Sequence, residues 1–336
     1  MKFVDDFRNP ALACDLLERI RRRASRPWVL MEVCGGQTHG LLRHGIAVAL
    51  EGVVELIHGP GCPVCVTPAA AIDLAQELSL RPGVVLASFG DMLRVPGSQG
   101  SLLDARARGG DVRTVYSPLD AVALARREPD RQVVFFAVGF ETTVPTTALA
   151  ALQAERLGLE NFSLLVAHVR VQPAMEALLQ AADCRVQGFL AAGHVCTVLG
   201  WESYVDFVAR HQVPLVVTGF EPVDLLEGIL EAVEQLETGR FRVANCYSRS
   251  VQEQGNPEAQ GLINQVYEAA DSPWRGLGVI PGGGLRLKPR FRRFDAEARF
   301  GRARVPVESE GDCLAGEVLA GRIRPTACPQ FGVRCT

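Results

Sequence analysis

Two short glycine-rich motifs near the amino-terminal end of the chain hold three cysteines and a histidine. The first motif reads CGGQTH from Cys34 to His39, and the second reads GPGCPVC from Gly59 to Cys65, with Cys62 inside it. Each motif follows an apolar run that is typical of a strand. Three thiolates and an imidazole in that setting could bind a soft metal ion, exchange thiols and disulfides, or do both.

The C-x-x-C pair, Cys62 and Cys65, precedes a helix-like run from Ala69 to Leu80. Thiols near the start of a helix gain thiolate character from the helix dipole, and this spacing permits a reversible disulfide. Two inert thiols in a structural turn are the alternative interpretation, but the preceding Gly-Pro-Gly and the other thiol motif favour chemistry. A closed zinc site would need four ligands, so it is the less favoured use of the three thiols and His39.

Cys34 is followed by two glycines, which would let a bulky ligand approach the backbone and its N–H donors. His39 could ligate a metal, carry a proton or cap the following helix. Further along, Glu141 lies in the sequence GFETT, which matches no nucleotide-binding fingerprint. Glu141 could hold a positive group or take a proton, while Thr142 and Thr143 could cap the next helix.

Short β-rich runs alternate with helical runs along most of the chain, which predicts parallel sheets covered by helices on both faces. The first four expected strands are Trp28–Val33, Val53–Ile57, Val84–Ser88 and Val112–Tyr116, and the second four are Val133–Val138, Ser163–His168, Val186–Leu190 and Leu215–Thr218. The helices expected between them include Thr146–Leu157, Ala174–Ala182 and Tyr204–His211.

We therefore expect an α/β protein with two similar doubly wound parallel-sheet domains, at residues 1–118 and 119–239, around a cleft. A weak internal repeat supports their likeness, because the tripeptide Gly-Phe-Glu follows an expected strand at both 139–141 and 219–221. Residues 240–336 are richer in arginine, glycine and proline and are expected to form a smaller, irregular α+β domain, which contains Cys313, Cys328 and Cys335.

Most of the polar candidates come at or just after the ends of expected strands. In open α/β sheets the ligand crevice lies beyond the carboxyl ends of the strands. We therefore expect one cleft, between the two sheet domains, that gathers Cys34, Cys62, Cys65, Asp91, Glu141, His168, His194 and Glu221.

The composition and charge of the chain argue against two classes of function, nucleic-acid binding and membrane insertion. The net charge of −3, without a basic stripe of interleaved aromatics, argues against a nucleic-acid binder. No apolar stretch approaches the roughly 20 residues that span a bilayer, and the amino terminus lacks the apolar region of a signal peptide. We therefore expect a cytoplasmic protein with no membrane partner, in which the 10 cysteines serve metal or redox chemistry rather than a disulfide framework.

The tail from Cys328 to Cys335 holds two thiols with a proline and a glycine between them. Such a loop could wrap an iron–sulfur cluster, which takes four cysteine ligands. Cys313 is the one further donor nearby, so the ligand set within the sequence is incomplete. The alternative interpretation is a frayed terminus with two inert thiols.

The motifs together resemble the HypD family of hydrogenase formation and maturation proteins over essentially the whole chain. The segments that carry the resemblance are distinctive in order and spacing: residues 34–39 and 59–65, GFETT at 139–143, GHV at 193–195, GFEP at 219–222, Gly255-Asn256, WRGLG at 274–278 and the tail from Cys328 to Cys335.

The resemblance implies an assembly scaffold with thiol redox activity, rather than a turnover enzyme, for the iron centre of [NiFe] hydrogenases. Members of the family work with a small partner, HypC, and together they carry an iron that receives two cyanides and one carbon monoxide. HypE delivers cyanide made from a carbamoyl group that HypF attaches, and the Fe(CN)2CO unit is destined for the hydrogenase large subunit. By this resemblance Cys34 is the iron-ligating thiolate, and Cys62 and Cys65 are the redox pair.

The chain also departs from the family pattern. HypD proteins usually continue past the position of Thr336 with two more cysteines that complete a [4Fe–4S] site, of which Cys328 and Cys335 match the first two ligands. We therefore expect a shortened chain or a variant without the cluster. A general thiol–disulfide oxidoreductase that uses Cys62 and Cys65 is the alternative function, but the Cys34 motif and the lack of a thioredoxin-like W-C-x-x-C favour the scaffold. A folded but inactive maturation protein is the third interpretation.

Overall fold

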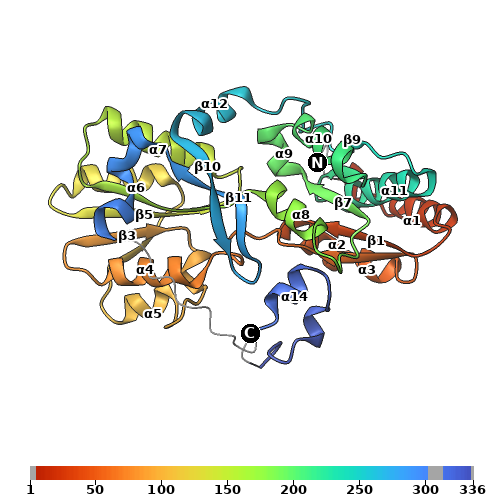
Figure 1. The fold of residues 1–336 in the computed structure, drawn as a ribbon, viewed down its shortest axis with the longest axis horizontal. Helices are drawn as coiled ribbons and strands as arrows, with labels where there is room; N and C mark the ends of the chain where they lie inside the picture. Colours follow the sequence, from red (N-terminus) through yellow and green to blue (C-terminus); the bar gives the residue numbers. More distant parts are fainter. Residues whose placement is uncertain (1–4, 302–312, 334–336) are drawn as a thin grey trace. The chain divides into compact units, whose positions relative to one another are not determined.

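The computed structural model describes residues 5–301 and 313–333. The chain forms two compact units, each built from separate stretches of sequence. Unit 1 comprises Met1–Cys62, Ala174–Pro257 and Leu314–Thr336, and unit 2 comprises Pro63–Pro173 and Glu258–Cys313. Both units are shown in Figure 1, coloured along the sequence.

Unit 1 is a five-stranded parallel sheet in the order β2-β1-β7-β8-β9, with helices packed on it. Its strands are β1 (Trp28–Glu32), β2 (Val54–His58), β7 (Gly188–Ala192), β8 (Leu215–Thr218) and β9 (Val243–Asn245). Its α-helices are α1 (Pro10–Arg23), α2 (Gly35–Arg43), α3 (Ile46–Ala49), α9 (Gly193–Leu199), α10 (Val205–His211), α11 (Pro222–Thr238) and α14 (Ala315–Leu319), together with α8 (Val171–Leu179), which begins at the end of unit 2. Short 3-10 turns are η1 (Asp6–Arg8), η3 (Glu202–Tyr204) and η5 (Pro325–Ala327).

Unit 2 has a four-stranded parallel sheet in the order β4-β3-β5-β6 and an antiparallel hairpin of β10 and β11. Its strands are β3 (Val84–Ser88), β4 (Val112–Thr114), β5 (Gln132–Gly139), β6 (Phe162–His168), β10 (Tyr267–Trp274) and β11 (Gly278–Leu287). Its helices are α4 (Ala69–Ser79), α5 (Leu102–Ala107), α6 (Pro118–Arg127), α7 (Val144–Arg156), α12 (Pro257–Val266) and α13 (Ala296–Phe300), with the 3-10 turns η2 (Met92–Arg94) and η4 (Pro289–Phe294).

The unit 2 sheet is buried on both faces, as its apolar strands require. Alternate side chains of a strand point to opposite faces. Val133 and Phe135 of β5 pack in one core with α6 and α7, whereas Val134 and Phe136 pack in another with α4 and α5. Helices on both sides of a parallel sheet are the doubly wound arrangement.

The unit 1 sheet is wound in the same way. Leu30, Leu190 and Val216 face a core shared with α1 and α11. On β7 the neighbouring side chain, Phe189, meets Phe207 of α10 edge-on, with ring centroids 5.8 Å apart. The prediction of doubly wound parallel sheets is therefore confirmed in both units.

The predicted grouping of the strands is wrong. The expected first set placed β1, β2, β3 and β4 together, but β1 and β2 share a sheet with β7 and β8, while β3 and β4 share one with β5 and β6. The alternation of strands and helices along the sequence is the same for the predicted and the observed grouping, so it cannot show which strands pair. Residues 240–336, expected as a third domain, contribute Glu258–Cys313 to unit 2 and the stretches on either side to unit 1.

Three of the four points where the chain passes between units lie at a proline. The crossings are Cys62 to Pro63, Pro173 to Ala174, Pro257 to Glu258 and Cys313 to Leu314. Pro173 lies in the first turn of α8 and Pro257 is the first residue of α12, positions where a proline is tolerated because its missing N–H has no intrahelical partner. Within the described residues, no helix is long and apolar enough to cross a membrane.

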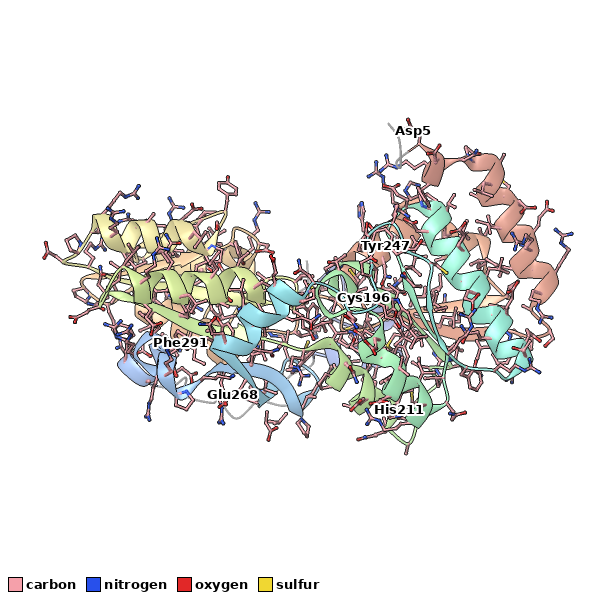
Figure 2. All side chains as sticks on the ribbon, turned by 90° about the horizontal axis from the view of Figure 1, so that it is seen from above. Asp5, Cys196, His211, Tyr247, Glu268 and Phe291 are labelled. Atoms are coloured by element: carbon pink, nitrogen blue, oxygen red, sulfur yellow. The ribbon has the colours of Figure 1, made fainter. Side chains whose placement is uncertain are left out.

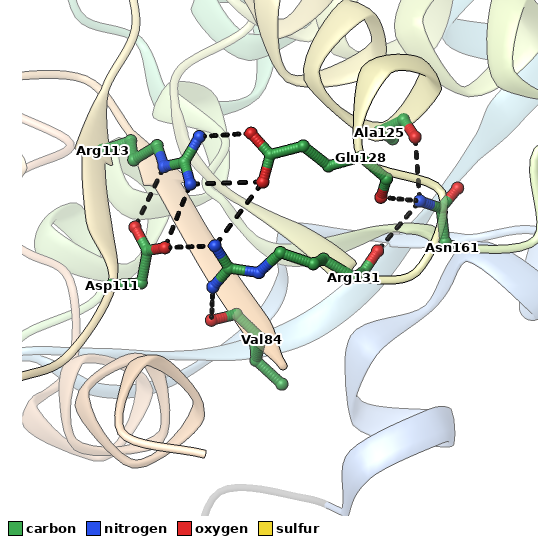
Figure 3. Close-up of polar contacts among 7 residues, drawn as sticks. All are labelled: Val84, Asp111, Arg113, Ala125, Glu128, Arg131 and Asn161. Atoms are coloured by element: carbon green, nitrogen blue, oxygen red, sulfur yellow. Dashed lines mark hydrogen bonds and ion pairs between the residues drawn. The ribbon is translucent and has the colours of Figure 1, made fainter. Parts of the chain in front are cut away.

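A network of ion pairs joins the amino-terminal ends of β4 and β5 in unit 2 (Figure 3). Arg113 donates to both carboxylate oxygens of Asp111, at 3.0 and 3.1 Å, and to both of Glu128, at 2.7 and 3.2 Å. Arg131 pairs with Asp111 at 2.7 Å. Since ligands bind at the opposite, carboxyl edge of such sheets, we assign these residues to stability.

Asn161 completes this edge of the sheet. Its side-chain nitrogen donates to the carbonyls of Ala125 at 2.9 Å, Glu128 at 3.0 Å and Arg131 at 2.9 Å (Figure 3). Ala125 is in the last turn of α6, which leaves its acceptors without intrahelical partners, Glu128 is the residue that caps the helix, and Arg131 directly precedes β5. One buried amide therefore caps α6 and fixes the turn into β5.

We predict that Asn161→Ala lowers the free energy of unfolding by about 2 kcal/mol, because buried carbonyls lose their donor. Denaturant titration followed by circular dichroism measures the change. Arg126→Ala, at an exposed position of α6, is the control and should change stability by less than about 0.5 kcal/mol. Equal stability of Asn161→Ala and the control would show that the cap contributes nothing.

Candidate functional site

The order of strands in unit 1 places one crevice at the carboxyl edge of its sheet. The chain leaves β1 for β2 on one side and leaves β7 for β8 on the other, so β1 and β7, which pair directly, form a topological switch point. Ligands of open α/β sheets bind at such a point, beyond the strand ends. Cys34 follows β1, and His194 is the second residue of α9, directly after β7.

Cys34 and His194 meet there. The Sγ atom of Cys34 lies 3.6 Å from Nδ1 of His194. Cys34 is 4% exposed, and its burial raises the pKa of the thiol above the ordinary value, although backbone N–H groups of Gln37 and Gly36 oppose the rise. Burial also lowers the pKa of His194, so its imidazole is neutral near neutral pH. A neutral imidazole beside a protonated thiol can accept the thiol's proton when a metal displaces it.

The backbone around Cys34 is fixed by the segment that leads to Cys62. Gly35, the first residue of α2, donates its N–H to the carbonyl of Gly61 at 3.1 Å, and Gly59 donates to the carbonyl of Glu32 at 2.9 Å. A Cβ on Gly61 would overlap the backbone of Cys34. Glycine is therefore required at position 61 for the two loops to pack backbone to backbone.

Phe220 forms an aromatic wall beside the thiol. A Cβ on Gly36 would lie 3.1 Å from the ring of Phe220 and 3.5 Å from Sγ of Cys34, so glycine at position 36 leaves this space open. The ring centroid of Phe220 is 5.5 Å from that of His194 and 6.0 Å from that of Tyr247, which is labelled in Figure 2. The site thus combines one thiol, one imidazole and an apolar wall.

The Phe220 loop is held in place by charged side chains. Asp224, which is fully buried, accepts the backbone N–H groups of Phe220 and Glu221 at 3.2 Å each. Arg249 binds both oxygens of Asp224, at 2.5 and 2.6 Å. Glu221 pairs with Arg8, which lowers the pKa of the Glu221 carboxyl. Glu221, expected in the cleft, therefore serves to anchor this loop and η1.

Gln37 ties the start of α2 to the edge of the sheet. Its side-chain nitrogen donates to the carbonyl of Ala191 at 3.0 Å and to the hydroxyl of Thr218 at 2.6 Å, at the ends of β7 and β8. Its Oε1 atom is buried and has no hydrogen-bond partner among the described residues. This amide fixes the helix that begins at Cys34.

His39 lies on the exposed surface of α2, whereas the histidine that contacts Cys34 is His194. Cys34 caps the helix, and a residue five positions on is turned about 140° away from it in a helix of 3.6 residues per turn. The functional role of His39 stays a prediction. Sequence reasoning placed His194 at a strand end but could not pair it with Cys34, because that contact depends on the pairing of β1 with β7.

Cys62 and Cys65 are both disulfide-bonded in the structure. The other described cysteines form no disulfide: Cys14, Cys34, Cys184, Cys196, Cys246, Cys313 and Cys328. The C-x-x-C motif is therefore able to adopt the oxidised state that its spacing permits. Whether it exchanges electrons stays a prediction at this point.

Glu141 occupies a separate polar position in unit 2, after β5. Its Oε1 accepts the backbone N–H of Val171 at 3.1 Å, and its Oε2 is buried without a hydrogen-bond partner within residues 5–301 and 313–333. Burial raises the pKa of Glu141 to about 7. A carboxyl group that titrates near neutrality can take or release a proton, so the expected proton-handling role fits its chemistry.

The other candidates of unit 2 have structural roles. His168 is buried, which lowers its pKa to about 4, and its ring bonds to the hydroxyl of Thr147 at 2.8 Å and the carbonyl of Gly139 at 3.3 Å. Tyr267 donates to the same hydroxyl at 2.9 Å. Asp91 caps η2 through the N–H of Met92. One cleft that gathers these residues with Cys34 stays a prediction.

The residues expected to hold an iron–sulfur cluster do not form a ligand set in the described part of the chain. Cys328 is half-buried in unit 1, Cys313 is exposed in unit 2, and Cys335 lies outside the described residues. No group of three or more Cys, His, Asp or Glu side chains suited to a metal occurs among the residues that the structure describes. A cluster takes four cysteine ligands, so the described residues do not fit one.

Comparison with known proteins points to the same family as the sequence motifs do. The model of the HypD family, described as "Hydrogenase formation hypA family", matches residues 11–336. The chain is 48% identical over 349 residues to the hydrogenase maturation factor HypD of Rhodobacter capsulatus, covering all of this chain and 92% of that protein. It is 46% identical to HypD of Escherichia coli (strain K12), again over all of this chain and 92% of the relative. For HypD of Azotobacter vinelandii the identity is 47%, over all of this chain and 91% of the relative.

We predict that Glu141→Gln gains stability relative to the wild type as the pH rises from about 4.5 to about 7. In that window the folded wild type binds a proton that the unfolded chain has released, because the pKa is raised from 4.5 to about 7 on folding. Raising the pH therefore lowers the contribution of Glu141 to the free energy of unfolding of the wild type. Across this pH range the free energy of unfolding of the variant, relative to that of the wild type, should change by about 3 kcal/mol in total.

The measurement is the free energy of unfolding of both proteins across this pH range. The contribution of His168, whose lowered pKa acts with the opposite sign, cancels in the difference between the two proteins. A difference that does not change with pH would show that Glu141 titrates normally.

Proposed function

The chain belongs to the HypD family of hydrogenase maturation factors, and from this premise we propose that it carries the iron of the hydrogenase cofactor on Cys34 during assembly. The observation that carries the proposal is the meeting of Cys34 and His194 at the switch point of the unit 1 sheet. The iron, with its two cyanides and one carbon monoxide, is the cargo of this site.

The chemistry of the site suits this cargo. Low-spin iron that bears cyanide and carbonyl ligands is soft, and thiolate is the ligand that soft metals prefer. Because Cys34 is held as a neutral thiol by burial, iron binding must release its proton, and the adjacent imidazole of His194 can accept it. The apolar ring of Phe220 limits water beside the metal.

We propose that a HypC-like partner supplies a second thiolate to the same iron. The exposed backbone of Gly35 and Gly36 beside Cys34 supports this, since two glycines leave room for another chain to approach. Gly35 has no atom within 4 Å of the place where a Cβ would stand. A carrier that shares its iron between two proteins can release it by exchange of thiolate ligands, whereas a closed cage cannot.

We propose that Cys62 and Cys65 are the redox pair of this assembly. Reduction of their disulfide consumes two electrons and two protons and yields two thiols. The packing of Gly61 against the Cys34 backbone supports a link between the pair and the iron site. In this scheme a HypE-like protein donates cyanide, and the finished unit passes to the hydrogenase large subunit. No step is assigned to an iron–sulfur cluster.

We predict that Cys34→Ser abolishes bound iron–cyanide while the fold survives, because serine keeps the size of the side chain and removes the soft ligand. The chain is purified anaerobically with its HypC-like partner, and infrared spectra are recorded in the cyanide and carbonyl stretching region. The wild type should show both sets of bands, and Cys34→Ser should show neither.

Cys14→Ser, at an exposed position of α1, is the matched control and should keep the bands. Bands of equal intensity in Cys34→Ser would remove Cys34 as the iron ligand. A wild type that reduces ordinary protein disulfides in the absence of iron and partner would instead favour a general thiol–disulfide oxidoreductase.

A further inference from the structure

The carboxylate of Glu32 is completely buried at the end of β1, two residues before Cys34. Burying a charged group is unfavourable unless hydrogen bonds replace its hydration. A buried carboxylate is therefore expected where its hydrogen bonds hold neighbouring segments of the chain in place. Neither metal ligation nor the proposed redox exchange uses Glu32.

Three donors from three parts of unit 1 converge on this carboxylate. The backbone N–H of Cys34 donates to Oε2 at 2.9 Å. The hydroxyl of Thr38, on the second turn of α2, donates to Oε1. The ring of His58, the last residue of β2, reaches the same oxygen with Nδ1 at 2.8 Å. Because a carboxylate only accepts, His58 carries its proton on Nδ1 in this contact.

The contact with His58 is reinforced by the main chain. The residue after it, Gly59, donates its N–H to the carbonyl of Glu32 at 2.9 Å, so Glu32 holds this segment through both its side chain and its backbone. Two residues later, Gly61 accepts the N–H of Gly35. The segment that leads to Cys62 is therefore held by hydrogen bonds to Glu32, before Cys34 in the chain, and to Gly35, directly after it.

We propose that Glu32 is a positioning residue for Cys34, which it holds against the start of the Cys62 loop through His58. The carboxylate fixes the backbone on the amino side of the thiol, and Thr38 fixes the helix on the other side. The inference rests on the proposed function only in taking Cys34 as the iron ligand. The geometric claim concerns the order of the Cys34 loop and holds without iron.

The test changes His58, which contacts Glu32 but not the thiol. His58→Phe keeps an aromatic ring and removes the donor. Alkylation of a buried thiol requires local opening, so a looser loop reacts faster. We expect iodoacetamide to modify Cys34 roughly ten times faster in His58→Phe than in the wild type. Peptide mass spectrometry, with the Cys62 and Cys65 disulfide kept oxidised, separates Cys34 from the other thiols.

Two further variants keep the test specific. His58→Asn places an amide N–H where Nδ1 stood and should restore the slow rate of the wild type. Gln187→Ala removes a side-chain acceptor from Val29 at the opposite end of β1, where the bond is 3.0 Å, and should leave the Cys34 rate unchanged. A wild-type rate in His58→Phe would overturn the proposal. So would a fast rate shared by His58→Asn or by Gln187→Ala.

Infrared spectra of the same variants, purified with the HypC-like partner, connect the geometry to the cargo. We expect weaker iron–cyanide bands in His58→Phe and normal bands in His58→Asn. If the wild type shows no bands, the proposed function fails, while the alkylation rates still decide the role of Glu32. If the bands are normal in every variant although His58→Phe reacts fast, Glu32 positions Cys34 as proposed, and only the link between this positioning and iron binding is overturned.

Discussion

The parallel pairing of β1 with β7 is the constraint on which the candidate functional site depends. These strands are far apart in sequence, yet their register places Glu32 opposite Leu190, so the turns that follow them emerge side by side. One turn presents Cys34 and the other His194, and the pairing of these two strands brings this thiol and this imidazole together. The chemistry of the site is therefore a consequence of tertiary topology, although each of its residues is set by a local strand-to-helix turn.

A second consequence is the way the two thiol loops are joined. β2 lies on the other side of β1, so the Gly59–Cys62 segment starts beside the end of β1 as well. Glycines at 59 and 61 let that segment approach the backbone of Glu32 and Cys34, where any side chain would collide. The buried carboxylate of Glu32 connects the two loops, because it accepts the backbone N–H of Cys34 and contacts the ring of His58. Directly after Cys62 the chain passes into unit 2, so the boundary between the two units falls inside the motif, between Cys62 and Cys65.

Much of the local structure could be predicted from the sequence. All eight expected strands are present within a residue or two of their expected limits, because runs rich in valine, isoleucine and leucine between helical segments are a strong signal of buried parallel strands. The grouping of those strands could not be predicted in the same way. Residues 63–173 form most of unit 2 between two stretches of unit 1, and a local pattern of strands and helices is identical whether or not such an interruption occurs.

The geometry of the candidate site could be predicted only in part, for related reasons. Cys34, Cys62 and Cys65 could be proposed as site residues from their types and spacing, but His39 was favoured over His194 because it is near Cys34 in sequence. Helical geometry turns His39 outward, and strand pairing brings His194 in. Glu32 gave no signal, since a single acid at the end of an apolar strand is commonplace. Its three buried donors are visible only in the folded chain.

The most direct measurement of the central claim is X-ray absorption at the selenium edge of a chain that carries selenocysteine in place of Cys34. The protein is isolated anaerobically with its HypC-like partner, so that any iron is retained. If Cys34 is the iron ligand, selenium should have an iron atom in its first coordination shell. A first shell of carbon alone, in a sample that contains iron–cyanide, would place the iron elsewhere and contradict the account.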